Sequence, residues 1–153
     1  MTKLKIDKIR TDGNTQSRIG LSATTVAAYA EVIEDHRREN ADDPKVANAW
    51  PFRDPVIVFF DGKDHWLADG FHRVAGCKNA GRAVVEADIR QGSQRDAMLY
   101  AAGANADHGL QRTANDKRRA VFMLLGDPEW AKWSDRQIAR ACHVSPTLVG
   151  NIR

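Results

Sequence analysis

Five consecutive residues, 69–73, read Asp-Gly-Phe-His-Arg and combine a carboxylate, an imidazole and a guanidinium next to a glycine. The apolar run 66–68 before them predicts a strand, and the spacing of the residues after them predicts a short helix. A tight turn from strand to helix leaves the first N–H groups of the helix unpaired, and these groups favour a bound anion. We therefore predict a phosphate site here, with Asp69 as the candidate catalytic residue. The residues predicted to bind phosphate are Gly70, Phe71, His72 and Arg73.

This turn also has a purely structural interpretation. The glycine then only permits the bend, and His72 and Arg73 face solvent. A second polar segment adds Asn105 and Arg112, whose amide and guanidinium could contact the same ligand, because guanidinium geometry suits bidentate contact with phosphate. The alternative for this segment is a helix C-terminus that breaks at Gly109.

The turn at 69–73, followed by an Ala/Gly-rich helix, resembles the signature of the ParB/sulfiredoxin superfamily, whose members bind nucleotide phosphates at this turn. Residues 16–18, Gln-Ser-Arg, resemble the Gln-Pro-Arg element of the partition proteins, with serine in place of proline. The segment with Asn105 and Arg112 resembles their Glu-Asn-x-x-Arg box, although Ala104 replaces the glutamate and three extra residues precede the arginine. In that family the box completes a site for cytidine triphosphate and magnesium.

The resemblance therefore implies a bound nucleotide, CTP or ATP, with magnesium reached through Asn105. The missing glutamate weakens the implication for metal binding and for hydrolysis by a nucleoside triphosphatase. Free-serine kinases of the superfamily carry a similar Asp-Gly-x-His-Arg turn, so a small-molecule kinase that uses Asp69 is the alternative function. Sulfiredoxin chemistry is nearly excluded, because Phe71 occupies the place of its catalytic cysteine.

Composition sets the outer limits of these interpretations. The 153 residues, 42% hydrophobic and 28% charged, suffice for one core with a small helical appendage. No apolar run reaches the length of a membrane span and the polar N-terminus lacks a signal-peptide core, so we expect a cytoplasmic protein with no membrane partner. Cys77 and Cys142 have no metal-ligand spacing, which also fits a reducing compartment. Residues 110–153 hold eight Lys/Arg against four Asp/Glu, and this +4 balance predicts a nucleic-acid partner.

The residue pattern predicts a compact mixed α/β domain over residues 1–93. Strands are expected at 4–9, 55–60, 65–68 and 83–89, where apolar or alternating residues lie between turn residues. One helix begins after Ser22, and the signature helix is expected to bury Phe71, Val74 and Ala75. Residues 36–54, which contain two prolines, are predicted to form a long loop that could act as a lid.

Helices are predicted for the rest of the chain. Residues 94–128 form linking helices, of which the first continues to residue 109 and the second begins with a capping box at Thr113. Residues 129–153 are typical of a helix-turn-helix, with His143 at the left-handed turn position that glycine usually holds. The chain stops in the last turn of the expected recognition helix, so we expect further DNA-binding structure beyond it. The predicted DNA contacts are Arg136, Arg140, Ser145, Thr147, Asn151 and Arg153.

These features together predict the α+β fold class: a ParB/sulfiredoxin-like mixed α/β domain followed by an all-α helix-turn-helix region. The predicted function is that of a ParB-like protein that binds double-stranded DNA, in plasmid or chromosome partition or in transcriptional regulation. We expect gating by a nucleotide, a homodimer, and association with the nucleoid when DNA is bound.

Overall fold

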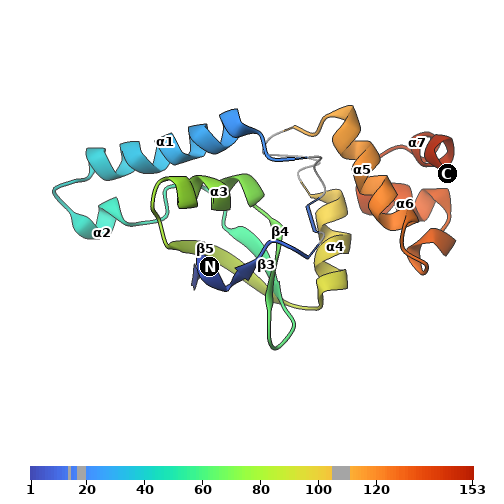
Figure 1. The fold of residues 1–153 in the computed structure, drawn as a ribbon, viewed down its shortest axis with the longest axis horizontal. Helices are drawn as coiled ribbons and strands as arrows, with labels where there is room; N and C mark the ends of the chain where they lie inside the picture. Colours follow the sequence, from blue (N-terminus) through green and yellow to red (C-terminus); the bar gives the residue numbers. More distant parts are fainter. Residues whose placement is uncertain (14, 17–19, 105–110) are drawn as a thin grey trace.

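The computed structural model describes residues 1–13, 15–16, 20–104 and 111–153. Figure 1 shows an elongated molecule in which a sheet and its covering helices occupy one end and a group of short helices occupies the other. The predicted order, a mixed α/β part followed by helices, is confirmed. No helix within the described ranges is long and apolar enough to span a membrane.

The sheet has five strands in the order β1-β5-β3-β4-β2. β3 is central and runs parallel to β5 and antiparallel to β4, the latter through a hairpin at the predicted Asp61-Gly62 turn. The hairpin strands and β5 match the predicted apolar runs. The strand bounds are Thr2–Lys5 for β1, Ile9–Arg10 for β2, Val56–Phe60 for β3, His65–Asp69 for β4 and Val84–Gln91 for β5.

The predicted single strand over residues 4–9 is wrong, because a 3-10 turn at Ile6–Lys8 interrupts it. Ile6 is buried there, and its N–H donates to the carbonyl of Ala83 at 2.9 Å. The turn carries the chain from β1 at one edge of the sheet to β2 at the other. Neighbouring strands lie about 4.8 Å apart, so three residues can join the two edges only if the sheet curls.

Both faces of the sheet are buried, each against different helices. Val56, Val58 and Leu67 face one core cluster, together with Val85 and Ala87 of β5. The alternate residues of β3 and β4 face a second cluster that includes Ala97. The period of two in a strand therefore explains why β3 is apolar at every position rather than at every second one. The second cluster consists of Ile57, Phe59, Trp66, Ala68 and Ala97.

Helices α1 (Ala23–Glu39) and α3 (Phe71–Asn79) cover the first face. They cross closely at Gly76, where an added Cβ would lie 2.8 Å from the Cβ of Tyr29. Gly76 and Cys77 of α3 are therefore buried, whereas Phe71 and Ala75 are only partly covered. Of the residues predicted to be buried in this helix, Val74 is buried. The prediction missed the residues that meet α1, which lie on a neighbouring face of the helix. The N-cap prediction for α1 is confirmed, since the Ser22 hydroxyl accepts from the N–H of Thr25 at 3.2 Å.

The predicted long loop at residues 36–54 is wrong. α1 continues to Glu39, and a short helix, α2 (Pro44–Ala47), follows after Asp43 caps its first turn. Trp50 then packs against the first core cluster, with the guanidinium of Arg82 5.4 Å from its ring centre. Arg82 also donates to the carbonyl of Asn48 at 3.0 Å. These contacts fix the segment to the body of the protein, which leaves no support for a lid.

The other end of the molecule is helical. Helices α4 to α7 and the 3-10 turn η2 surround a third cluster that is built from Val121, Leu124, Trp130, Ile138 and Val149. The predicted capping box at Thr113 and Asp116 is present, as is one at Ser134 and Gln137. The bounds are Gln94–Gly103 for α4, Ala114–Leu125 for α5, Trp130–Lys132 for η2, Asp135–Cys142 for α6 and Pro146–Ile152 for α7.

α4 lies between the sheet and the helical end (Figure 1) and contributes to both cores. Ala97 faces the sheet, while Ala102 belongs to the helical cluster and Met98 packs against it. The predicted helix break at Gly109 lies outside the described residues, and α4 already ends at Gly103. The predicted division at residues 93 and 128 stays a prediction, but a boundary at 93 would separate the sheet from a helix that covers it.

Candidate functional site

The turn between β4 and α3 has the backbone geometry that the sequence predicted. Gly70 has φ 105°, a left-handed value that residues with a side chain adopt at a cost. An added Cβ would lie 2.5 Å from Cγ1 of Val56, so the position also lacks room for any other residue. Gly70 is the N-cap of α3 and supplies no capping side chain. The start of α3 therefore keeps the anion-favouring character of an uncapped helix N-terminus.

Arg73 does not point away from the protein to meet a ligand. One of its terminal nitrogens donates to the backbone carbonyls of Asp54 and Pro55, at 2.6 and 3.1 Å. The other lies 3.6 Å from the carboxylate of Asp69, and both side chains are largely buried. The predicted phosphate ligand and the candidate catalytic acid are thus paired with each other in the interior. The segment before β3 has no sheet partner for these carbonyls, and the guanidinium satisfies them.

His72 is also turned inward. It is 8% exposed, and its Nε2 accepts a hydrogen bond from the backbone N–H of Ser22 at 2.9 Å. An accepting ring nitrogen carries no proton, so this arrangement holds the neutral imidazole. His72 therefore joins the start of α1 to the start of α3, and neither predicted orientation, toward a phosphate or toward solvent, describes it.

Arg112 links the C-terminal ends of helices α4 and α6. Its guanidinium is buried and donates to the carbonyls of Cys142 and His143 at 2.9 and 3.0 Å. A further, longer bond reaches the carbonyl of Ala102 at 3.3 Å. These carbonyls end α4 and α6, where a cation is favoured by the helix dipole. The donors of Arg112 thus face helix ends, while its role as a phosphate ligand stays a prediction.

The structure gives less information on the remaining elements of the predicted nucleotide site, which are Asn105 and a metal ion. Asn105, the predicted route to magnesium, lies outside the described residues. Among the residues that the structure describes, no group of three or more His, Cys, Asp or Glu could hold a metal ion. Both cysteines are buried, and burial raises the pKa of the Cys77 thiol to about 11 and that of Cys142 to about 12. Neither thiol is a nucleophile at neutral pH.

A pocket of about 290 Å³ opens beside α3. Phe71, Val74, Ala75 and Lys78 line it from the helix, and they share one helical face by their spacing of three and four residues. Thr11, Gln16, Gly20 and Leu21 line it from the segment before α1. Of the residues predicted to bind phosphate, Phe71 alone is in this lining. The lysine was missed, although its position seven residues after Phe71 on an otherwise apolar face was visible in the sequence.

The pocket is connected to the helical part through a contact that the sequence did not indicate. The Nε of Arg119 in α5 donates to the backbone carbonyl of Gln16 at 2.9 Å. Arg119 is one of three consecutive basic residues, and it is half-buried, whereas Lys117 and Arg118 are exposed. One member of this basic run therefore makes a contact inside the protein, while the other two lie at its surface.

The turn between α6 and α7 was predicted more accurately. His143 has φ 55° and ends α6 in the left-handed conformation, as expected from its tolerance of that region. Ser145 then caps α7, with its hydroxyl accepting from the N–H of Leu148 at 3.2 Å. Val149 anchors α7 in the helical core and is fully buried. The outward face of this helix is left to Thr147 and Asn151, which are one turn apart and exposed.

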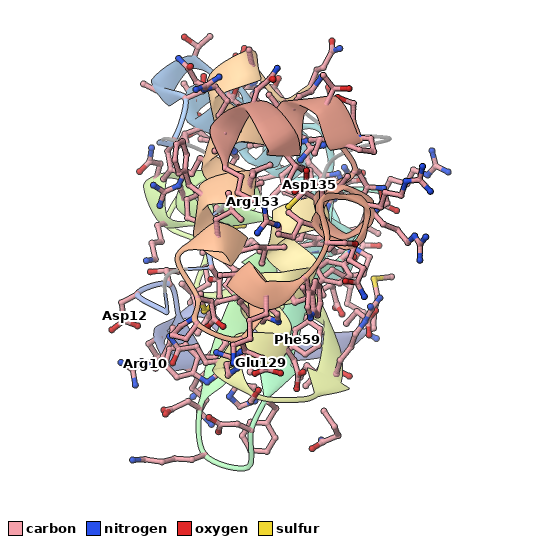
Figure 2. All side chains as sticks on the ribbon, turned by 90° about the vertical axis from the view of Figure 1, so that its right-hand side faces the viewer. Arg10, Asp12, Phe59, Glu129, Asp135 and Arg153 are labelled. Carbon is pink, nitrogen blue, oxygen red and sulfur yellow. The ribbon has the colours of Figure 1, made fainter. Side chains whose placement is uncertain are left out.

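Arg136 and Arg140 lie one turn apart on α6 and are both exposed. Neither forms an ion pair with any part of the chain that the structure describes. Arg153, in contrast, donates to the carboxylate of Asp135 at 2.8 Å and to the carbonyls of Ala131 and Trp133. Figure 2, which looks onto this end of the molecule, shows Arg153 and Asp135 together. Arg153 thus joins the end of α7 to the start of α6, and its contact with DNA stays a prediction.

Comparison with known proteins adds to this geometry. No family model matches the chain. The "Streptomycin biosynthesis operon possible regulatory protein" of Streptomyces griseus is 31% identical over 142 residues, which are 90% of this chain and 40% of that protein. The transcriptional regulator NovG of Streptomyces niveus is 29% identical over 99 residues, 65% of this chain and 30% of that protein. The chain thus spans well under half the length of these relatives.

The solved structures that this chain resembles include the C-terminally truncated chromosome-partitioning protein ParB of Caulobacter crescentus complexed to the centromeric parS site. The likeness covers 99% of this chain and 70% of that one, with a TM-score of 0.58 and 13% identity. The same truncated ParB complexed with CTP-gamma-S gives a TM-score of 0.52 over 99% of this chain and 75% of that one, also at 13% identity. The chain has a ParB-like fold. The likeness is one of fold, and it agrees with the resemblance to the partition proteins at residues 69–73.

The signature turn has the predicted backbone geometry, while His72 and Arg73 contact other parts of this chain. A fold fixes the path of the chain, and the contacts of individual side chains vary within it. Nucleotide binding and a role for magnesium stay predictions for this chain. The three predicted phosphate-binding side chains with the clearest surroundings, His72, Arg73 and Arg112, hold the ParB-like fold together.

Proposed function

We propose that this chain is the DNA-binding part of a transcriptional regulator, and that α6 and α7 form its helix-turn-helix. The observation that carries the proposal is the outward face of this helix pair. Thr147 and Asn151 are exposed on α7 while Val149 is anchored, which is the arrangement needed for a helix that enters the major groove. Arg136 and Arg140 lie beside it on α6 and are available for phosphate.

The charge of this end of the molecule supports the same conclusion. Four acidic residues are present among residues 110–153, and three of them, Asp127, Glu129 and Asp135, are paired with arginines. Within the part of the chain that the structure describes, the exposed basic residues of this end without such partners are Lys117, Arg118, Lys132, Arg136 and Arg140. Positive charge left without an internal partner favours an anionic surface such as the DNA backbone.

The relatives favour regulation over partition as the biological setting. Two of the proteins that this chain resembles are named as regulators, and the ParB likeness concerns the fold. The chain spans only part of those regulators. The comparison therefore shows neither which genes are controlled nor the oligomeric state. Partition, dimerisation, nucleotide gating and the kinase alternative stay predictions, and Asp69 of the kinase hypothesis is not among the residues that line the pocket.

A salt titration of DNA binding tests the proposal. Affinity for random and for selected duplexes is measured by fluorescence anisotropy across salt concentrations with the wild-type chain and with Arg140→Ala. We expect binding that weakens steeply with salt, and a slope reduced by about one in the variant on every duplex. Lys45→Ala is the matched control, because Lys45 is exposed on α2 at the opposite end of the molecule. Undetectable affinity at low salt, or an unchanged slope for Arg140→Ala, refutes the proposal.

Asn151→Ala tests sequence recognition separately from phosphate contact. An asparagine can pair with adenine through two hydrogen bonds, so its loss should cost about 1–3 kcal/mol on the best duplex and little on random DNA. Equal losses on both duplexes would assign Asn151 to the backbone of the DNA.

A further inference from the structure

The pocket beside α3 has an internal polarity that limits what it can bind. Its floor is the helix face of Phe71, Val74, Ala75 and Lys78, apolar for the first turn and ending in a cation. At 1.5 Å per residue the floor is about 10 Å long. The opposite wall adds the apolar side chain of Leu21, which is 48% exposed. A ligand with an apolar body would cover this leucine and the adjacent phenylalanine ring.

The lining residues that the structure describes carry a small charge of one sign. Lys78 is the only charged side chain among them, and it forms no ion pair within the described ranges of the chain. None of these described lining residues is a carboxylate. The uncapped start of α3 adds a partial positive charge at the opposite end of the floor. A ligand with one negative charge is therefore attracted by Lys78 or by the start of α3, and none of the described lining residues repels it.

A nucleoside triphosphate requires more cations than these residues provide. Arg73 is bound to two backbone carbonyls and lies beside Asp69, and Arg112 is bound to the ends of α4 and α6. Release of Arg112 would leave the buried carbonyls of Ala102 and Cys142 without this donor, and release of Arg73 would leave the part-buried carbonyl of Pro55 without it, at a cost that the ligand would have to supply. The pocket is also at the lower end of the volumes usual for ligand sites, which run from about 300 to 1,000 Å³.

We propose that this pocket binds a small organic acid with an apolar body and a single carboxylate, held by Lys78 and by the apolar face of α3. The binding does not depend on the proposed DNA function. The carbonyl of Gln16 in the pocket wall accepts from Arg119 of α5, so an occupant of the pocket lies one residue from the helical part. The site is thus suited to an effector of the regulator.

Amide NMR spectra recorded with phenylacetate, 4-phenylbutyrate and octanoate test this assignment. We expect at least one of these carboxylates to shift the resonances of Leu21, Phe71 and Ala75 in a saturable manner. The neutral amide 4-phenylbutanamide should bind more weakly than 4-phenylbutyrate, by about two- to fivefold, the size of an exposed charge contact. Lys78→Met should remove this difference, while Lys63→Met, a change of an exposed lysine in the β3–β4 turn, should keep it.

Ala75→Leu should fill the pocket and weaken both the acid and its amide, with the wild-type spectrum retained elsewhere as proof of folding. Two results overturn the proposal. One is the absence of saturable shifts with all three carboxylates. The other is that CTP with magnesium shifts the same resonances at lower concentration than any carboxylate, which would assign the pocket to a nucleotide.

Discussion

Two turns in this protein share a backbone feature and treat their polar side chains in opposite ways. Gly70 before α3 and His143 before α7 both adopt left-handed dihedrals, and each turn is followed by residues able to bind an anion or a base. After the first turn, His72 and Arg73 point inward and bond to the protein. After the second, Thr147 and Asn151 remain at the surface. The local sequence does not distinguish the two outcomes.

The difference lies in what surrounds each turn. The α3 turn is enclosed by irregular segments, and the backbone groups of Ser22, Asp54 and Pro55 there find their partners in side chains. The helix that follows the α7 turn is capped by its own Ser145. The backbone near this turn therefore does not need the side chains of α7 as hydrogen-bond partners. A polar side chain is left for function where the nearby backbone is already satisfied.

Gly70→Ala should have the largest effect on stability, because it changes the enclosed turn. The Cβ would be strained by the φ of 105° and would contact Val56 at 2.5 Å. We expect a loss of about 2–5 kcal/mol in the free energy of unfolding, measured by urea denaturation. Gly62→Ala is the matched control, because Gly62 has φ 99° with nothing within 4 Å of an added Cβ. An equal loss in both variants would show that the crowding at Val56 is unimportant.

Arg112→Met should follow, with a loss of about 2–4 kcal/mol, since three carbonyls of α4 and α6 lose a buried charged donor. Thermal and urea unfolding measure it. Lys117→Met, an exposed change on α5, should stay within about 0.5 kcal/mol. If the two variants are equally stable, Arg112 does not hold the helix ends together.

Arg73→Met and Arg140→Met sharpen the comparison directly, with one arginine from each turn region. Arg73→Met should lower stability by about 1–3 kcal/mol through its lost carbonyl contacts and leave the salt dependence of DNA binding unchanged. Arg140→Met should leave stability within about 0.5 kcal/mol and lower the salt slope. Urea denaturation and fluorescence anisotropy of both variants measure stability and the salt slope. The reverse pattern would contradict the distinction between inward and outward side chains.

The smallest expected effect concerns a half-exposed arginine, Arg95, which pairs with Asp127 and lies 4.4 Å over the ring of Trp130. Its guanidinium first, and the amides of Trp130 and Glu129 next, lower the pKa of Asp127 to about 2 from an ordinary 3.8. A lowered pKa in the folded state stabilises above pH 3.8, and this contribution is lost as the pH falls through about 2.

Asp127→Asn should therefore lower the melting temperature slightly at pH 7, and the difference from wild type should shrink between pH 4 and pH 2. Calorimetric scans at several pH values measure the difference. Asp42→Asn, which changes an exposed carboxylate after α1, is the control and should show no such trend. A constant difference across the range would mean that the ion pair does not titrate in this way.

The parts of the fold that were predicted correctly are those fixed by neighbours in the sequence. Ser22 and Thr113 cap their helices, and His143 takes the left-handed position, because each interaction spans four residues or fewer. The buried stripe of α1 follows from periodicity in the same way. The ParB-like fold was accessible because its signature lies at one such local turn.

The partners of the long side chains could not be predicted. Arg73 meets carbonyls 18 and 19 residues earlier, and Arg112 meets one 31 residues later, so their targets depend on the assembled fold. Arginine is the residue type that satisfies such carbonyls and also the type that binds phosphate. The type and the spacing therefore could not separate a structural guanidinium from a functional one.

The position of α4 between two cores has a consequence for how such a chain can be inherited. Ala97 must fit the sheet, and Ala102 must fit the helices beyond it. A recombination event that joined the sheet of one relative to the helices of another would place its crossover next to or within this helix. Each face of α4 would then have to match a different parent. The sheet and the helical end are therefore expected to pass between genomes together.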